Sequence, residues 1–136
     1  MFHVTQAIPF CYGHRLLHYD GKCGRLHGHN GVAVIELRAP ALDAQGMVVD
    51  FDLVQRRVQA WLFETLDHKL LLHRDDPVGA ALRGLGEPFC QVDFNPTAEN
   101  IARMIFEHAA ATGLPVFEVR LQEMEGSVAS YAPARS

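Results

Sequence analysis

The sequence has no apolar run close to the roughly 20 residues that cross a bilayer, so we expect no membrane partner. It has no basic excess either. Its 12 Lys and Arg against 16 Asp and Glu leave a net charge of −4, too acidic for a general nucleic-acid binder. Because the net charge is negative, any anion-binding site must be local. The start of the chain lacks the basic residues and apolar block of a secretory signal, which indicates a cytoplasmic protein.

Cysteine is also scarce, and the three residues present are too few and odd in number for a disulfide framework. Cys11 and Cys90 each follow a phenylalanine in an apolar stretch, which is typical of a buried structural thiol. Cys23 lies among glycines and cationic residues in the segment 21–25, and this setting favours an exposed, stabilised thiolate. We therefore expect Cys23 to be the reactive thiol, acting either as a base or as a metal ligand.

Repeats, low-complexity tracts and linkers are all missing, so nothing in the sequence divides the chain. Its 136 residues, 49% of them hydrophobic, are enough for one sizeable core and leave little room for a second. We predict a single domain over residues 1–136.

Alternating apolar residues predict strands at both ends of the chain. Pro9 places the first strand at an edge or a bulge. The residues that share one face of this strand are Phe2, Val4, Ile8 and Phe10. A loop over 13–29 leads to a strand at 32–37 that is apolar on nearly both faces. Further strands are predicted at 47–49, 116–123 and 127–132.

Amphipathic helices are predicted in the middle of the chain. The first begins at Asp50 or Asp52, since either is a plausible N-cap, and ends near 66–68. Its buried stripe comprises Val54, Val58, Trp61, Leu62 and Thr65. The second begins at 95–97 and ends at Gly113.

The segment 73–95 between these helices is rich in proline and glycine, so it is predicted to be mostly loop with one helical turn at 78–82. Strands that enclose a helical pair indicate an α+β domain, an antiparallel sheet with both helices on one face. Because the strand at 32–37 is apolar on its second face too, we expect that face to pack against other subunits.

Histidine is abundant, with eight residues in all and four of them between His14 and His29. On an extended backbone His27 and His29 point to the same side, and Gly28 between them allows a ligand to approach. Two neutral imidazoles make half of a zinc site, which needs a third ligand and keeps one position open when it is catalytic. His14 and His18 are the nearest candidates for that ligand, and hydrogen-bonded surface histidines are the alternative interpretation.

Two further sites carry ionisable groups in informative places. Asp67 and His68 lie at a predicted helix end, where they could form an acid/base pair or serve as ordinary capping residues. Glu123 has the same parity as the core-facing Val119 and Leu121, so its carboxylate needs partners. A ligand with adjacent N–H donors could supply them, unless the strand ends at residue 122 and the side chain turns outward.

Together these residues resemble the 6-pyruvoyl-tetrahydropterin synthase family, particularly its bacterial branch, the 6-carboxy-tetrahydropterin synthases that make a precursor of queuosine. The similarity covers nearly the whole chain and is specific through the order and spacing of its segments. Only three residues separate Cys23 from His27, as is typical of the carboxy branch, and the longer insertion of the animal enzymes is absent. The matching segments are 10–16, 22–30, 46–51, 66–68, 95–100 and 119–123.

The resemblance implies a zinc ion, a catalytic triad and a carboxylate that anchors the pterin. The implied zinc ligands are His14, His27 and His29, the triad is Cys23, Asp67 and His68, and the pterin anchor is Glu123. It also implies the tunnelling fold (T-fold), a four-stranded antiparallel sheet with two helices on one face. Members of the family form trimers whose sheets close a barrel and pair as homohexamers, with active sites between subunits.

The implied reaction converts 7,8-dihydroneopterin triphosphate to 6-carboxy-5,6,7,8-tetrahydropterin, acetaldehyde and triphosphate. Lys22 and Arg25 are the nearby cations for the triphosphate. The alternatives are 6-pyruvoyl-tetrahydropterin synthesis, which eliminates triphosphate only, and a non-catalytic zinc- and pterin-binding protein. The sequence departs from the family pattern at three places. Cys11, Tyr12 and Gly13 stand where small residues usually precede the first zinc histidine. Gly31 replaces an aromatic residue after the His-Gly-His-Asn motif, and Met124 replaces a hydroxyl residue after the anchoring glutamate.

Overall fold

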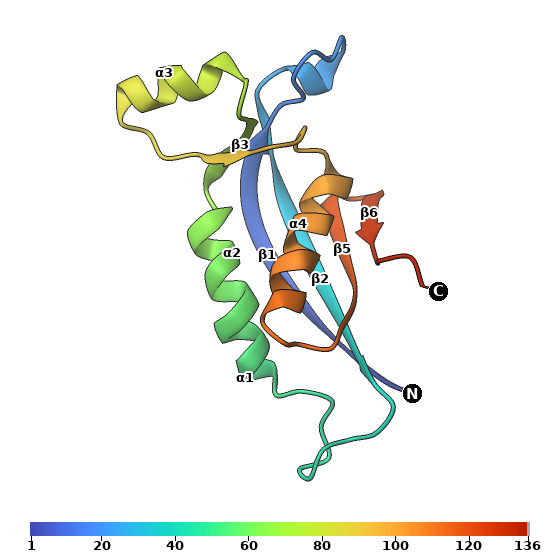
Figure 1. Ribbon diagram of the computed structural model, residues 1–136. Coiled ribbons are helices and arrows are strands. Elements are labelled where there is room, and N and C mark those ends of the chain that lie inside the picture. The colour runs from blue at the N-terminus through green and yellow to red at the C-terminus, as the bar shows by residue number, and fades with distance from the viewer. Residues whose placement is uncertain (136) are drawn as a thin grey trace.

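A long antiparallel hairpin forms the centre of the molecule, whose computed structural model describes residues 1–135 (Figure 1). Its strands are β1 (Phe2–His14) and β2 (His27–Ala39). On the far side of β2 lie β5 (Val116–Met124) and then β6 (Ser127–Tyr131), both antiparallel to their neighbours. These strands form the predicted four-stranded antiparallel sheet.

The sheet is nevertheless wider than predicted, because two short strands extend it beyond β1. Strand β3 (Lys69–His73) pairs with β1 and β4 (Cys90–Val92) pairs with β3, both in parallel, giving the order β4-β3-β1-β2-β5-β6. The expectation of four strands was therefore wrong in number. Segments of five and three residues are too short to show a period of their own, and their pairing depends on the strand beside them.

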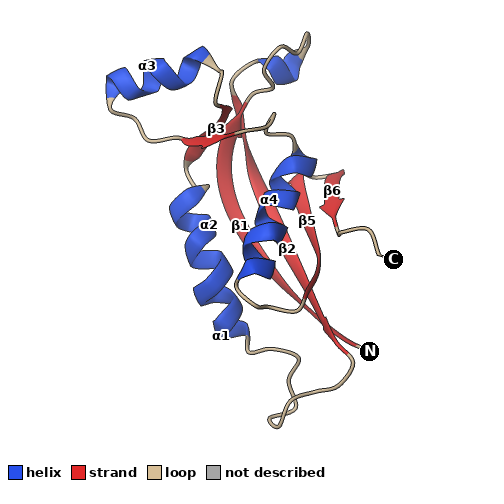
Figure 2. Ribbon diagram, viewed as in Figure 1, coloured by secondary structure: helices blue, strands red, loops and turns tan. Residues whose placement is uncertain are grey.

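Both predicted helices cover the same face of the sheet (Figure 2). The first is a continuous helical segment that includes a π-helical stretch, and its parts are α1 (Phe51–Val54), η2 (Gln55–Gln59) and α2 (Ala60–Thr65). Asp50 is its N-cap, since its side chain accepts a hydrogen bond from the Asp52 backbone N–H. The second helix is α4 (Ala98–Ala111), which Thr97 caps through the backbone N–H of Asn100.

The core lies between these helices and the sheet. Even-numbered residues of β1 and odd-numbered residues of β2 face the helices. The fully buried members of the core include Ile8, Ile35, Leu121, Val54, Val58, Leu62, Ile101 and Ile105. Trp61 and Thr65 of the predicted stripe are only partly buried. No helix between residues 1 and 135 is both long and apolar enough to cross a membrane.

Three local predictions need correction. The single helical turn expected at 78–82 is a full helix, α3 (Pro77–Leu85), capped by the buried Asp76 and ended by Gly86 at φ 73°. The strand expected at 47–49 is absent, since these residues follow an Asp43 turn and do not join the sheet.

The loop expected over 13–29 is shorter than predicted, because β1 continues to His14 and β2 begins at His27. The turn that remains contains the short helix η1 (Lys22–Gly24). Arg15 follows β1 and contacts Asp76, the N-cap residue of α3. Its guanidinium donates two hydrogen bonds, of 2.7 and 2.6 Å, to the Asp76 carboxylate. This pairing with Arg15 holds the pKa of Asp76 below its usual value.

Tyr12 and Gly31, two positions at which the sequence differs from the pattern of the family it resembles, lie against each other in the core. Tyr12 is buried, with an exposed fraction of 3%, and its ring stacks on Phe10 with 5.2 Å between centroids. A Cβ added at Gly31 would lie 3.0 Å from Cε1 of Tyr12 and 3.3 Å from the Gln122 carbonyl oxygen. The Tyr12 ring therefore occupies space above Gly31 that an aromatic residue at position 31 would need.

We expect Gly31→Phe to lower the free energy of unfolding by about 1–3 kcal/mol through overpacking, and Tyr12→Ala to lower it by about 3 kcal/mol through the cavity that it leaves. The double variant Tyr12→Ala/Gly31→Phe should be more stable than the sum of the two losses predicts, by about 1 kcal/mol or more. Urea unfolding of the four proteins measures this coupling. Strictly additive losses would show that the two positions do not share one space.

Candidate metal centre and active site

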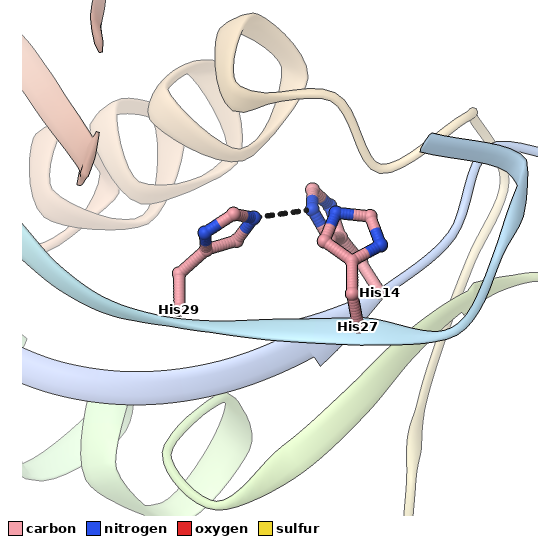
Figure 3. Close-up of side chains that lie close together, drawn as sticks. All are labelled: His14, His27 and His29. Atoms are coloured by element: carbon pink, nitrogen blue, oxygen red, sulfur yellow. Dashed lines mark hydrogen bonds between the residues drawn. The ribbon is translucent and has the colours of Figure 1, made fainter. Parts of the chain in front are cut away.

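Three histidines meet at the end of the central hairpin, on the face that carries the helices (Figure 3). His14 is the last residue of β1 and pairs in register with His27, the first residue of β2. His29 has the same parity as His27, so its ring lies on the same side. One ring nitrogen from each of the three histidines lies within 4.8 Å of the others. The third member predicted for the cluster is thus His14, whereas His18 is exposed and lies outside it.

Backbone carbonyls orient two of the three rings. Nδ1 of the buried His14 lies 2.7 Å from the Pro96 carbonyl oxygen, and Nδ1 of His27 lies 2.6 Å from the Arg25 carbonyl oxygen. Each Nδ1 must carry a proton to donate to a carbonyl, so each neutral ring has its lone pair on Nε2. Metal-binding histidines in proteins are commonly held in this way, by a hydrogen bond from the nitrogen that does not bind the metal.

The Nε2 atoms of His14 and His29 are so close together that a proton or a cation must lie between them. Nε2 of His14 lies 3.1 Å from Nε2 of His29, and two lone pairs at that distance repel unless a proton or a cation is shared. Burial lowers the pKa of His14, although the Pro96 carbonyl and the Glu123 charge act in the opposite direction. Imidazole nitrogens are ligands that suit zinc, so the three histidines are a donor set that fits this metal.

Glu123 faces this cluster, as its parity on β5 predicted. Its Oε1 lies 3.3 Å from Nε2 of His14 and 3.4 Å from Nε2 of His29. The Tyr12 hydroxyl donates a third contact to the same oxygen, at 3.3 Å. The carboxylate is 23% exposed, so one side of it remains open to a ligand.

Sequence reasoning did not identify Tyr12 as a residue of the site. Its even position on β1, directly opposite His29, was the available signal. Burial and the neighbouring Glu123 charge raise the pKa of Tyr12 well above its usual value, so the phenol remains a protonated donor. The Tyr12 hydroxyl reaches Glu123 from β1, whereas Met124, the residue that follows Glu123 on β5, has no hydroxyl group.

Cys23 lies on the same side of the sheet as the histidine cluster, in the helix η1. It is exposed, and its carbonyl oxygen accepts a hydrogen bond of 2.8 Å from the Leu16 backbone N–H. Together with His14 and Glu123 it lines a cavity of about 460 Å³. Its sulfur does not belong to the group of donor atoms within 4.8 Å of one another, so the geometry favours the interpretation of Cys23 as a base.

Lys22 and Arg25 flank Cys23, and both are exposed. Their positive charges are therefore open to solvent and to an anionic ligand beside Cys23.

Asp67 and His68 lie elsewhere, between α2 and β3. Nδ1 of His68 is 2.8 Å from Oδ2 of Asp67, so the pair is in contact. Burial alone would raise the pKa of Asp67, but hydrogen bonds from the Cys11 backbone and from His68 outweigh it and lower the pKa. His68 lines a different hollow from Cys23. A single chain therefore does not bring the three predicted triad residues into one cavity.

Cys11 differs from its prediction as a buried structural thiol. It is only partly buried, and its sulfur lies 3.4 Å from each ring nitrogen of His68. Cys90, also partly buried, fits the structural interpretation, since burial raises the pKa of its thiol.

Comparison with known proteins identifies the family of this chain. The family model described as 6-pyruvoyl tetrahydropterin synthase matches residues 3–134. A protein of Rickettsia conorii named 6-carboxy-5,6,7,8-tetrahydropterin synthase is 40% identical over 104 residues, covering 75% of each chain. A Haemophilus influenzae protein of the same name is 29% identical, covering 96% of this chain and 99% of its own.

Solved structures show the same fold. An uncharacterized protein from Wolinella succinogenes superposes with a TM-score of 0.80 at 24% identity, covering 98% of both chains. The 6-pyruvoyl tetrahydropterin synthase of Caenorhabditis elegans has a TM-score of 0.73 at 21% identity, covering 98% of this chain and 96% of its own. The match over nearly the whole sequence shows that this chain belongs to the 6-pyruvoyl tetrahydropterin synthase family of enzymes.

Proposed function

We propose that this chain is a zinc-dependent lyase that converts 7,8-dihydroneopterin triphosphate to 6-carboxy-5,6,7,8-tetrahydropterin, acetaldehyde and triphosphate. The observation that carries the proposal is the cavity shared by His14, Cys23 and Glu123, which combines a metal ligand, an exposed thiol and a hydrogen-bonding carboxylate. The names of the Rickettsia and Haemophilus relatives support the carboxy branch. The product would serve the synthesis of queuosine and related 7-deazapurines.

His14, His27 and His29 would hold the zinc ion through one ring nitrogen each. When bound, the metal supplies Lewis-acid polarisation of the hydroxyl oxygens on the pterin side chain. The carbonyls of Pro96 and Arg25 keep the ligand rings in orientation, so the site needs little rearrangement to bind it.

Glu123 would orient the substrate rather than react with it. Its open side can accept hydrogen bonds from the adjacent N–H donors of a pterin edge, and Tyr12 holds the carboxylate from the other side. The Cys23 thiolate, on the same cavity, would move a proton on the pterin side chain. Lys22 and Arg25 would bind the triphosphate at the rim.

Asp67 and His68 would complete the site from a neighbouring subunit. In one chain Cys23 and His68 line separate hollows, so a proton relay that uses both needs a second copy of the chain. The homohexamer implied by the family, a pair of trimers with active sites between subunits, meets this need.

Product analysis tests the reaction itself. Incubation with dihydroneopterin triphosphate should release acetaldehyde and triphosphate in equal amounts. Triphosphate with a pyruvoyl product would indicate the alternative activity that gives the family its name. No product at all would indicate a zinc- and pterin-binding protein without turnover.

The first prediction concerns the metal. The purified protein should contain about one zinc per chain, and His14→Ala, His27→Ala and His29→Ala should each lose most of it, because a catalytic zinc site has only three protein ligands. Elemental analysis measures the content, with His18→Ala as the control from the adjoining loop. If Cys23→Ala loses zinc while the histidine variants keep it, the ligand assignment is wrong.

The second prediction concerns the shared active site. Cys23→Ala and His68→Ala should each lower turnover by about 10²-fold or more, the usual contribution of a general acid or base. After the two inactive variants are unfolded, mixed in equal amounts and refolded, random assortment should restore roughly one quarter of the sites. Each variant refolded alone is the control. If the mixture is no more active than the separate variants, the two residues do not meet across a subunit interface.

The third prediction concerns Glu123. Glu123→Gln should weaken pterin affinity by about ten- to a hundredfold, because charge-assisted hydrogen bonds contribute about 1.5–3 kcal/mol. The amide conserves volume, so the thermal midpoint should change little. Glu125→Gln, on the exposed turn that follows, is the matched control and should leave affinity unchanged. Unchanged affinity with a large loss of stability would make Glu123 a structural residue instead.

A further inference from the structure

A second group of metal-ligating side chains lies outside the histidine cluster. It consists of Cys11 on β1 and the neighbouring residues Asp67 and His68, whose donor atoms also lie within 4.8 Å of one another. The thiol, carboxylate and imidazole come from segments 57 positions apart in the sequence and meet through the pairing of β1 with β3. The proposed reaction assigns no role to Cys11.

Backbone hydrogen bonds fix the relative positions of these residues. The Cys11 backbone N–H donates to Oδ1 of Asp67 at 2.9 Å, and its carbonyl oxygen accepts from the His68 backbone N–H at 2.7 Å. His68 is held at φ 58°, in the left-handed region that residues other than glycine rarely adopt. Both main-chain groups of Cys11 are thus used to hold an unfavourable turn that brings Asp67 and His68 to its thiol.

The distances between the donor atoms suit a tetrahedral metal ion. Donors bound to zinc at ordinary bond lengths are separated by roughly 3.2–3.6 Å. The Cys11 sulfur is 3.4 Å from both ring nitrogens of His68, a distance within this range, but it lies over the face of the ring, so the imidazole has to turn to direct a lone pair at a shared ion. Nδ1 of His68 and Oδ2 of Asp67 are 2.8 Å apart, so the proton that they share would be displaced and the pair would open slightly.

A cation can reach this group. Its members Cys11 and His68 line a hollow of about 560 Å³, and the His68 side chain is 78% exposed, which leaves its ring free to turn. Lys69 lines the same hollow, but its ammonium donates to the Glu64 carbonyl oxygen. The thiol favours a thiophilic ion such as Zn²⁺ over Mg²⁺ or Ca²⁺.

We propose that Cys11, Asp67 and His68 form a second site for a thiophilic divalent cation, separate from the three-histidine centre. A cation bound at this site inhibits the enzyme, because it removes His68 and Asp67 from proton transfer. This consequence rests on the proposed function. Binding itself does not depend on that function. The site therefore couples turnover to the concentration of free Zn²⁺.

Cobalt titration of the metal-free protein tests the binding. The first equivalent of Co²⁺ should occupy the histidine centre without thiolate-to-cobalt absorption in the near ultraviolet, and the second should produce that absorption. Cys11→Ser should abolish the thiolate signal, whereas Cys23→Ser and the control Cys90→Ser should keep it. A signal lost only in Cys23→Ser, or no thiolate signal in the parent protein, would overturn the proposal.

Zinc inhibition tests the consequence. With one zinc per chain already bound, additional Zn²⁺ should inhibit the parent protein. The concentration that halves the activity of Cys11→Ser, measured against its own activity without added zinc, should be higher by roughly tenfold or more. Equal sensitivity of the two proteins would contradict an inhibitory second site. Because the cobalt absorption is read without substrate, failure of the proposed reaction would not be mistaken for failure of this site.

Discussion

The register between β1 and β2 is the constraint on which the rest of the site depends. Because His14 pairs with His27, the parity that places Ile8 and Ile35 in the core continues to the end of the hairpin and places three imidazoles side by side. A shift of one residue would turn β2 over and send its two histidines to the opposite face. The apolar core therefore positions the three histidines, since any slip that separates them also exposes buried aliphatic side chains.

The same face also has to accommodate a carboxylate. Glu123 continues the buried side of β5, where its carboxylate accepts a hydrogen bond from the Tyr12 hydroxyl and lies beside the Nε2 atoms of His14 and His29. Tyr12 can lie at this point because Gly31 leaves room for its ring. The absence of a side chain at position 31 and the hydroxyl at the glutamate are thus linked through the single ring of Tyr12.

Periodicity predicted the parts of the molecule that depend on one element alone. It placed the two helices that cover the sheet, the shared side of His27 and His29, and the inward position of Glu123. It could not place Cys11 beside His68, because that contact requires the parallel pairing of the five-residue β3, which has no period of its own. Nor could it show that Cys23 and His68 line separate hollows, since this depends on how the turn after β1 and the end of α2 fold around the sheet.

The central claim is that the end of the hairpin builds a zinc centre from imidazoles alone. X-ray absorption at the zinc edge, on protein loaded with one equivalent of zinc, tests it most directly. The account predicts nitrogen or oxygen neighbours at about 2.0–2.1 Å, with the multiple scattering of three imidazoles and no sulfur. A sulfur neighbour at about 2.3 Å would place a cysteine on the metal and contradict the account.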